Sequence, residues 1–353
     1  MCDRTGTELT DPLPLLPDAL LPWFRENARD LPWRRDREPY HVWLSEIMLQ
    51  QTRAETVKSY YKRFLRALPD IQSLSNADPE QLHKLWEGLG YYTRVRNLQA
   101  AARQIMTKHG GAFPLDYDAI RALPGVGDYT AGAIASICFE LPTPAVDGNV
   151  LRVVSRVTAD KRPVNEEKTK RAVRDALRAA YPEGHCGEFT QALMELGAVV
   201  CLPNGAPACG RCPLSGFCRS RDGDWKTLPV KAQKKARRRE ELTVFILRRG
   251  EAVAVRKRPN AGLLAGLWEL PNVPGCLSPP DAAAQAERWG ARPVSLLRET
   301  RRGHIFTHVE WDMCCYFFDC RDAPGEDAFV WVSDGELETS VALPTAFRKC
   351  LET

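Results

Sequence analysis

The sequence predicts two domains of different class: a mainly α-helical domain to about residue 230 and an α+β domain over residues 241–353. Its 353 residues are more than one typical domain holds and fit two. Helix-length segments separated by glycine and proline turns fill the first part, whereas short β-branched runs dominate the second. Between them, residues 231–240 carry six basic groups and one acidic group, which is typical of a solvated linker.

Charge and hydropathy narrow the function classes. The net charge of the chain is +4 and the linker alone holds +5, so the rest of the chain is close to neutral. Any nucleic-acid binding must therefore rest on local basic patches and not on the overall charge. No apolar run of about 18 residues predicts a membrane helix. Residues 1–20 contain Asp3, Glu8, Asp11 and Asp18, unlike a signal peptide. We therefore expect an intracellular protein, in the bacterial cytoplasm or in the nucleus or mitochondrion of a eukaryote.

Helices of the first domain are predicted from apolar runs bounded by breakers and capping residues. They are expected near residues 20–28, 40–52, 54–67, 78–88, 97–108, 117–122, 130–137, 150–157 and 188–198. The segment 40–52 has apolar residues on nearly every side, which predicts a buried helix.

The segment Leu123-Pro-Gly-Val-Gly127 predicts a helix-hairpin-helix. One helix stops at Pro124, Gly125 and Gly127 make a turn that a side chain would obstruct, and a second helix starts near Thr130. The free N–H groups at that start suit a phosphate. A plain corner between two helices is the alternative.

Two acidic residues are candidates for catalysis. Glu46 is the only charged residue between Val42 and Thr52, so burial should raise its pKa and make it a proton donor. Asp147 precedes the helix at 150–157, whose N-terminus should keep it ionised. A buried structural Glu and an ordinary N-cap are the alternatives. A neutral and an anionic carboxyl together suit cleavage of a glycosidic bond.

The twelve cysteines divide into a cluster and a scattered set. Cys201, Cys209, Cys212 and Cys218 have the spacing C-x7-C-x2-C-x5-C, which favours a [4Fe–4S] cluster over zinc. The other eight are expected to be reduced thiols, because no export signal indicates an oxidising compartment.

Several motifs together resemble one known family. Trp43-Leu-Ser-Glu-Ile-Met-Leu-Gln-Gln-Thr52, Gly88-Leu-Gly-Tyr-Tyr92, Leu123–Gly127, Val146-Asp-Gly-Asn149 and the cysteine loop are similar to those of the helix-hairpin-helix DNA glycosylases, and more narrowly the MutY-type adenine DNA glycosylases. That resemblance implies two helical subdomains with the active site between them, and removal of adenine mispaired with 8-oxoguanine or guanine. The first cysteine spacing is one residue longer than the family's usual spacing.

The resemblance also implies roles for single residues. Glu46 would protonate adenine at N7, Asp147 would face the sugar cation, Asn149 would support the site and Tyr129 would hydrogen-bond near the carboxylates. Gln51 and Tyr91 would fill the base stack around 8-oxoguanine. Arg34, Gln191 and Glu195 would contact the extruded adenine. The full set of residues expected to contact DNA is Arg34, Gln51, Thr52, Tyr91, Gly125, Gly127, Gln191 and Glu195.

Tyr129 separates the alternative functions. The related endonuclease III-like family has a lysine here, which forms a Schiff base and cuts the strand, and tyrosine cannot form that imine. The expectation is thus a monofunctional enzyme, acting as a monomer on duplex DNA with an A·8-oxoguanine pair and without a membrane. An endonuclease III-like lyase and a non-catalytic iron–sulfur DNA-binding module are the alternatives.

The second domain resembles the Nudix-like domain of the same family. Strands are predicted at 241–247, 252–256, 294–299, 308–319 and 328–332, and helices at 281–289 and 345–351. After Gly266 the sequence lacks the Arg and Glu cluster of a Nudix hydrolase, so recognition is favoured over the third alternative, nucleotide pyrophosphohydrolysis. Phe306, Thr307 and His308 match a family loop that contacts 8-oxoguanine, with Thr307 where serine is frequent.

Overall fold

The computed structural model describes residues 11–233, 236–321 and 329–352, in two compact units. The first unit comprises residues up to 76 together with 97–233, and the second comprises 77–96 together with the chain from 234 onward. Four predicted features extend outside the described residues: Cys2, the acidic Asp3 and Glu8, part of the basic linker, and the start of the strand at 328.

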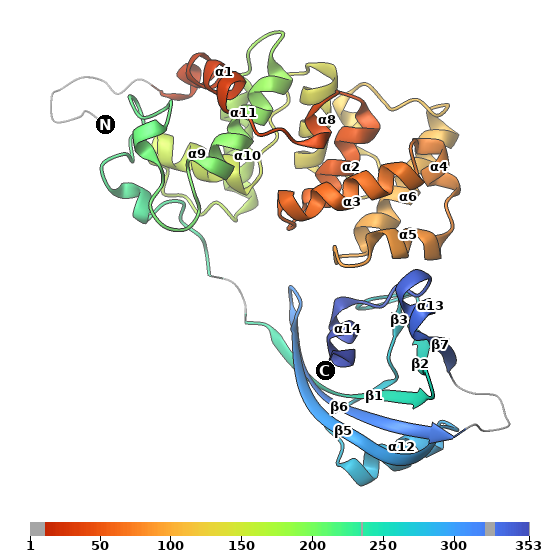
Figure 1. Ribbon diagram of the computed structural model, residues 1–353. Coiled ribbons are helices and arrows are strands. Elements are labelled where there is room, and N and C mark those ends of the chain that lie inside the picture. The colour runs from red at the N-terminus through yellow and green to blue at the C-terminus, as the bar shows by residue number, and fades with distance from the viewer. Residues whose placement is uncertain (1–10, 234–235, 322–328, 353) are drawn as a thin grey trace. The chain divides into compact units, whose positions relative to one another are not determined.

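The first unit is helical, as predicted (Figure 1). Its helices are α1 (Leu16–Asn27), α2 (Pro39–Leu49), α3 (Ala54–Ala67), α4 (Ile71–Asn76), α6 (Thr93–Lys108, which begins in the second unit), α7 (Tyr117–Arg121), α8 (Asp128–Phe139), α9 (Gly148–Thr158), α10 (Glu167–Arg178) and α11 (Cys186–Val199), with short 3-10 turns at Leu13–Leu15, Pro32–Arg34, Cys209–Arg211 and Asp224–Lys226. Helices α4 and α10 were not predicted from the sequence. Within the described chain, no helix combines the length and apolar character needed to cross a bilayer.

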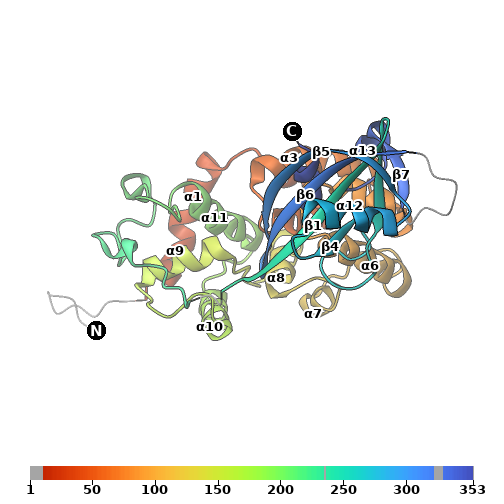
Figure 2. The same cartoon turned by 90° about the horizontal axis from the view of Figure 1, so that it is seen from below.

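Two helix groups build this unit. Apolar side chains of α1, α9, α10 and α11 form one core, and the partly buried Cys201, Cys212 and Cys218 pack against it. Figures 1 and 2 show α1, α9 and α11 side by side. In the other group, α8 packs against α2 and α7 and also contacts α11. Helix α2 is buried from Val42 to Met48, as its apolar sequence predicted.

The second unit contains a mixed sheet. Its strands are β1 (Arg238–Arg249), β2 (Ala252–Lys257), β3 (Trp268–Glu269), β4 (Asn272–Pro274), β5 (Arg292–Ile305), β6 (Val309–Arg321) and β7 (Val330–Ser333). The order is β3-β2-β1-β6-β5, with β4 paired to β1 and β7 to β2. Only β1 and β6 are parallel among these described pairs, with Val244 opposite Cys315.

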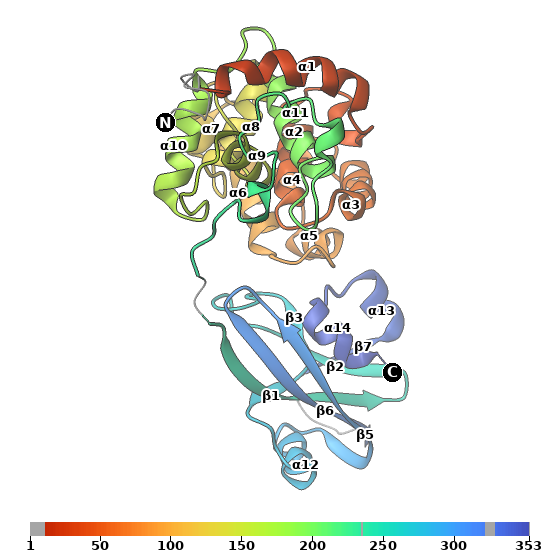
Figure 3. The same ribbon diagram turned by 90° about the vertical axis from the view of Figure 1, so that its left-hand side faces the viewer.

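Helices cover both faces of that sheet. Those of this unit are α5 (Pro79–Trp86), α12 (Pro279–Arg288), α13 (Asp334–Thr339) and α14 (Thr345–Leu351). Figure 3 shows α12 and α14 on opposite sides. Val244 and Ile246 pack with Phe347 of α14 on one face, whereas Phe245 and Leu247 pack with the alanines of α12 on the other. Because the middle of β1 is buried on both faces, its residues 242–247 are apolar except for Thr243.

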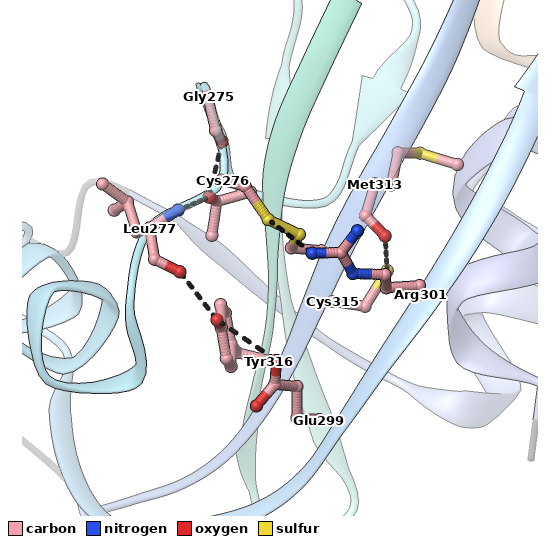
Figure 4. Close-up of a disulfide and its surroundings, with 10 residues drawn as sticks. Gly275, Cys276, Leu277, Glu299, Arg301, Met313, Cys315 and Tyr316 are labelled. Atoms are coloured by element: carbon pink, nitrogen blue, oxygen red, sulfur yellow. Dashed lines mark hydrogen bonds between the residues drawn. A yellow bond between two sulfur atoms is a disulfide. The ribbon is translucent and has the colours of Figure 1, made fainter.

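A disulfide in the second unit corrects one expectation. Cys276, just after β4, is bonded to Cys314 of β6, with their Cα atoms 5.8 Å apart (Figure 4). The Tyr316 hydroxyl donates to the Leu277 carbonyl at 2.7 Å and holds the same loop against β6. The two cysteines are 38 residues apart in sequence, so only the sheet brings them together. The remaining scattered cysteines within the described ranges are free thiols, as expected.

Candidate active site

Glu46 lies in the middle of α2, with 6% of its surface exposed. The Tyr129 hydroxyl, from the first turn of α8, donates to Glu46 Oε2 at 2.5 Å. The pKa of Glu46 is raised to about 7. Burial is the main cause and the Asp147 charge adds to it, while the bond from Tyr129 and the charge of Arg34 oppose the rise. Burial and the neighbouring carboxyls keep the pKa of Tyr129 well above its usual value, so the phenol stays a neutral donor.

Asp147 is the N-cap of α9, as its sequence position predicted. Its Oδ1 accepts from the Val150 backbone N–H at 2.7 Å and its Oδ2 accepts from Asn149 Nδ2 at 2.8 Å. Burial nevertheless raises the pKa of Asp147, and these two hydrogen bonds oppose the rise. Burial therefore acts against the helix N-terminus, which was expected to keep this carboxyl ionised, and sequence position offered no measure of that burial.

Hydrogen bonds thus join Glu46 of α2 to Tyr129 of α8, and Asp147 to Asn149 at the start of α9. The charge of Asp147 affects the pKa of both Glu46 and Tyr129, which places the two carboxyls within electrostatic reach.

Arg152 is a site residue that sequence analysis missed. It is buried on α9 and donates to Asn149 Oδ1 at 2.8 Å, to the Gly197 carbonyl at 2.7 Å and to the Cys201 carbonyl at 2.7 Å. One guanidinium therefore ties Asn149 to the end of α11 and to the cysteine loop. Its sequence signal is a single arginine within the apolar run Val150–Val154.

Gly197 sets the distance between α11 and α9. A Cβ on Gly197 would lie 2.5 Å from Asn149 Cβ and 3.1 Å from its Cα. We predict that Gly197→Ala lowers the free energy of unfolding by about 1–3 kcal/mol, because the helices must separate to admit a methyl group. Urea unfolding followed by circular dichroism measures this, and Gly216→Ala, which meets open space, is the control. Equal urea midpoints for the two variants would contradict the packing argument.

Arg34 and Glu195 form part of a buried ion-pair cluster. Glu195 on α11 accepts from Arg29 at 2.6 and 2.8 Å and from Arg34 at 2.8 Å. Burial favours a higher pKa for Glu195, but the bonds from Arg29 and the charge of Arg34 outweigh it and lower the pKa to about 2. Gln191 lies one helical turn earlier on the same face of α11. Arg29 had not been predicted.

In the hairpin between α7 and α8, the predicted obstruction by a side chain is found at Gly125 and not at Gly127. Gly125 has φ +75°, and a Cβ there would lie 2.6 Å from Asn97 Cβ. Gly127 is different: it has φ −94° and a Cβ would meet nothing within 4 Å, so a side chain would not obstruct the turn. Gly127 is instead the N-cap of α8. It is exposed and has no side chain to bond to the first N–H groups of that helix.

The two residues expected to enter the base stack share an unusual backbone conformation. Gln51, just past the end of α2, has φ 59°, and Tyr91 has φ 48°. Non-glycine residues rarely adopt this region, and such strain is concentrated at functional sites. Both side chains are exposed, and Thr52 follows with its N–H bonded to the Leu49 carbonyl.

In the second unit, Phe306, Thr307 and His308 form the turn between β5 and β6. The Phe306 ring packs edge-on against Trp311 with centroids 4.8 Å apart, while Thr307 and His308 are exposed. The Thr307 hydroxyl and the Tyr91 hydroxyl, both in this unit, are hydrogen-bonded at 2.9 Å. The unit therefore joins two residues that had been predicted separately to contact the same lesion.

All four clustered cysteines line one cavity of the first unit, with Val153, Arg156, Leu196, Leu214, Ser220 and other residues. Backbone N–H groups of Leu214 and Ser220 donate to the sulfurs of Cys212 and Cys218, and Arg156 Nη1 lies 3.3 Å from Cys201 Sγ. In the described chain, no three His, Cys, Asp or Glu side chains are placed to hold a single metal ion.

Comparison with known proteins identifies the family. Residues 44–179 match the HhH-GPD superfamily base excision DNA repair protein model, and residues 243–353 match the NUDIX domain. The adenine DNA glycosylase of Mus musculus is 33% identical over 397 aligned residues, covering 93% of this chain and 76% of the relative. The chain belongs to the adenine DNA glycosylase family.

Further members support this family assignment. The Homo sapiens adenine DNA glycosylase is 36% identical, covering 83% of this chain and 64% of the relative. Among solved structures, a thermostable thymine-DNA glycosylase aligns with a TM-score of 0.55 and 28% identity, over 60% of this chain and 97% of that chain. The sequence-based resemblance is confirmed: this adenine DNA glycosylase family member is a base-excision repair enzyme with a helical glycosylase unit and a Nudix-like domain.

Proposed function

We propose that the enzyme hydrolyses the N-glycosidic bond of adenine mispaired with 8-oxoguanine, or with guanine, in duplex DNA. The observation that carries this proposal is the buried Glu46 carboxyl, with its pKa near 7, beside a second carboxyl. A group with that pKa can hold a proton at neutral pH and deliver it to a leaving base.

In this mechanism the two carboxyls divide the work. The Asp147 carboxylate accepts two hydrogen bonds, which favour its charged form. Among the described residues, the Glu46 carboxyl accepts one hydrogen bond, from the Tyr129 hydroxyl. When the coupled pair holds one proton, that proton therefore belongs on Glu46. Glu46 donates it to adenine N7 as the base departs, and the Asp147 carboxylate stabilises the positive charge on the sugar. Asn149, held by Arg152, keeps Asp147 in place.

The recognition residues follow from the same proposal. Arg34, Gln191 and Glu195 would contact the extruded adenine, with Glu195 ionised and oriented by its two arginines. Gln51, Thr52 and Tyr91 would contact the opened stack, and the open end of α8 with Gly125 and Gly127 would bind phosphate. Phe306, Thr307 and His308 would contact the 8-oxoguanine. We propose that the protein acts as a monomer.

We further propose that the enzyme leaves the DNA strand intact. Tyr129 occupies the position at which a lysine would attack the sugar, and its hydroxyl is already committed to Glu46. A duplex with A·8-oxoguanine, with A·G and A·T duplexes as controls, tests both parts. Alkali-labile abasic sites without strand cuts support the proposal, and a covalent adduct trapped by borohydride in high yield favours the lyase. Hydrolysis of 8-oxo-dGTP would instead favour the pyrophosphohydrolase.

The pH dependence of kcat/KM should report Glu46. Only its protonated form donates, so kcat/KM should fall as pH rises through about 7. Because the bond from Tyr129 lowers the pKa of Glu46, Tyr129→Phe should move this alkaline limb to higher pH. Tyr117→Phe removes a phenol whose charged neighbours do not include Glu46, and should leave the limb in place. An unmoved limb in Tyr129→Phe would refute the assignment of the pKa to Glu46.

We propose that Cys201, Cys209, Cys212 and Cys218 hold a [4Fe–4S] cluster. The cavity supports it: four sulfurs face a largely apolar space, and N–H groups and Arg156 are placed to stabilise thiolates. In a [4Fe–4S] cluster each cysteine thiolate binds a different iron, so the four cysteine sulfurs lie farther apart than the ligands of a single metal ion. This spacing agrees with the described residues, in which no three side chains are placed around one ion. When bound, the cluster would supply a rigid cross-link for residues 201–218.

A further inference from the structure

Ser220 has a buried hydroxyl with no hydrogen-bond partner. The residue is 1% exposed, and its Oγ contacts neither a donor nor an acceptor among the residues that the structure describes. Burying a hydroxyl unpaired is costly, and native proteins rarely do so, which means that such an atom points to a missing partner.

The position of Ser220 limits what that partner can be. It lies two residues after Cys218, its backbone N–H donates to the Cys218 sulfur, and the residue lines the cavity that contains all four cysteines. Besides apolar side chains, the cavity lining includes Arg156, Ser215, Arg221 and Trp225, and none of these polar side chains hydrogen-bonds to the Ser220 hydroxyl. A sulfur-rich group in the cavity would present acceptors directly to Oγ.

We infer that the Ser220 hydroxyl donates a hydrogen bond to an inorganic sulfide of the bound iron–sulfur cluster. This inference rests on the proposed [4Fe–4S] cluster. Ser220 would then supply two donors to the cluster environment, its N–H and its O–H, beside the Arg156 guanidinium at Cys201. Hydrogen bonds to cluster sulfurs stabilise the more negative, more reduced state and so raise the reduction potential.

The test compares Ser220→Ala with Ser220→Thr, which keeps the hydroxyl, in the full-length protein purified without oxygen. Iron and sulfide are first measured on the wild type. Wild-type protein containing zinc, or no iron, would refute the cofactor proposal and this inference with it, whereas the adenine assay judges the catalytic proposal separately.

With the cluster present, the reduction potential is measured by voltammetry, and cluster loss in air is followed by its visible absorbance. Ser220→Ala should shift the potential to more negative values and lose its cluster faster, while Ser220→Thr keeps both near wild type. Loss of the cluster in Ser220→Ala alone, with Ser220→Thr loaded, also supports the inference. A Ser220→Ala protein with wild-type potential and lifetime, or equal cluster loss in both variants, would overturn it.

Discussion

Glu46→Gln should abolish most adenine release while leaving DNA binding intact. Glutamine can still accept the hydrogen bond from Tyr129, so the packing of α2 and α8 is preserved, but it carries no acidic proton to give to the base. General acid catalysis contributes about 10²–10⁴-fold, and we expect the single-turnover rate of base release to fall by about that factor.

Three measurements decide the assignment of Glu46. Single-turnover release gives the rate, a gel-shift titration with the same A·8-oxoguanine duplex gives the affinity, and circular dichroism checks folding. Glu167→Gln, on the exposed surface of α10, is the matched control and should behave as wild type. Base release that survives at the wild-type rate in Glu46→Gln would remove Glu46 from the mechanism, and lost binding in that variant would point to a structural role.

Asp147→Asn should have an effect of similar size for a different reason. The asparagine oxygen can still accept from the Val150 N–H and cap α9, so the fold is kept. The negative charge that would stabilise the sugar cation is lost, and removal of one electrostatic group of this kind costs about 10²–10³-fold in rate.

The shape of the pH profile separates the two carboxyls. In Asp147→Asn the alkaline limb should also change, because the Asp147 charge raises the pKa of Glu46 and its removal should move that limb to lower pH. Asp175→Asn, exposed on α10, serves as the control. A variant with unchanged release would mean that Asp147 is only a helix cap.

Local sequence determined much of the fold and the identity of the candidate residues. The buried helix α2 was predictable because its apolar residues are contiguous, and the position of Asp147 as a cap was predictable from Asp147-Gly-Asn149. The family motifs lie within short segments, so they can be identified without knowing how the segments meet. Five strands of the second unit, β1, β2, β5, β6 and β7, followed from β-branched runs in the same way, whereas the short β3 and β4 were not predicted.

Only the tertiary structure decided which side chains meet and how deeply they are buried. The pKa of Asp147, the ties from Arg152 to Asn149 and Cys201, and the disulfide between Cys276 and Cys314 all depend on segments distant in sequence. The physical reason is that burial and electrostatics arise from the packing of several elements at once, whereas helix caps, apolar runs and motif spacing are properties of neighbouring residues.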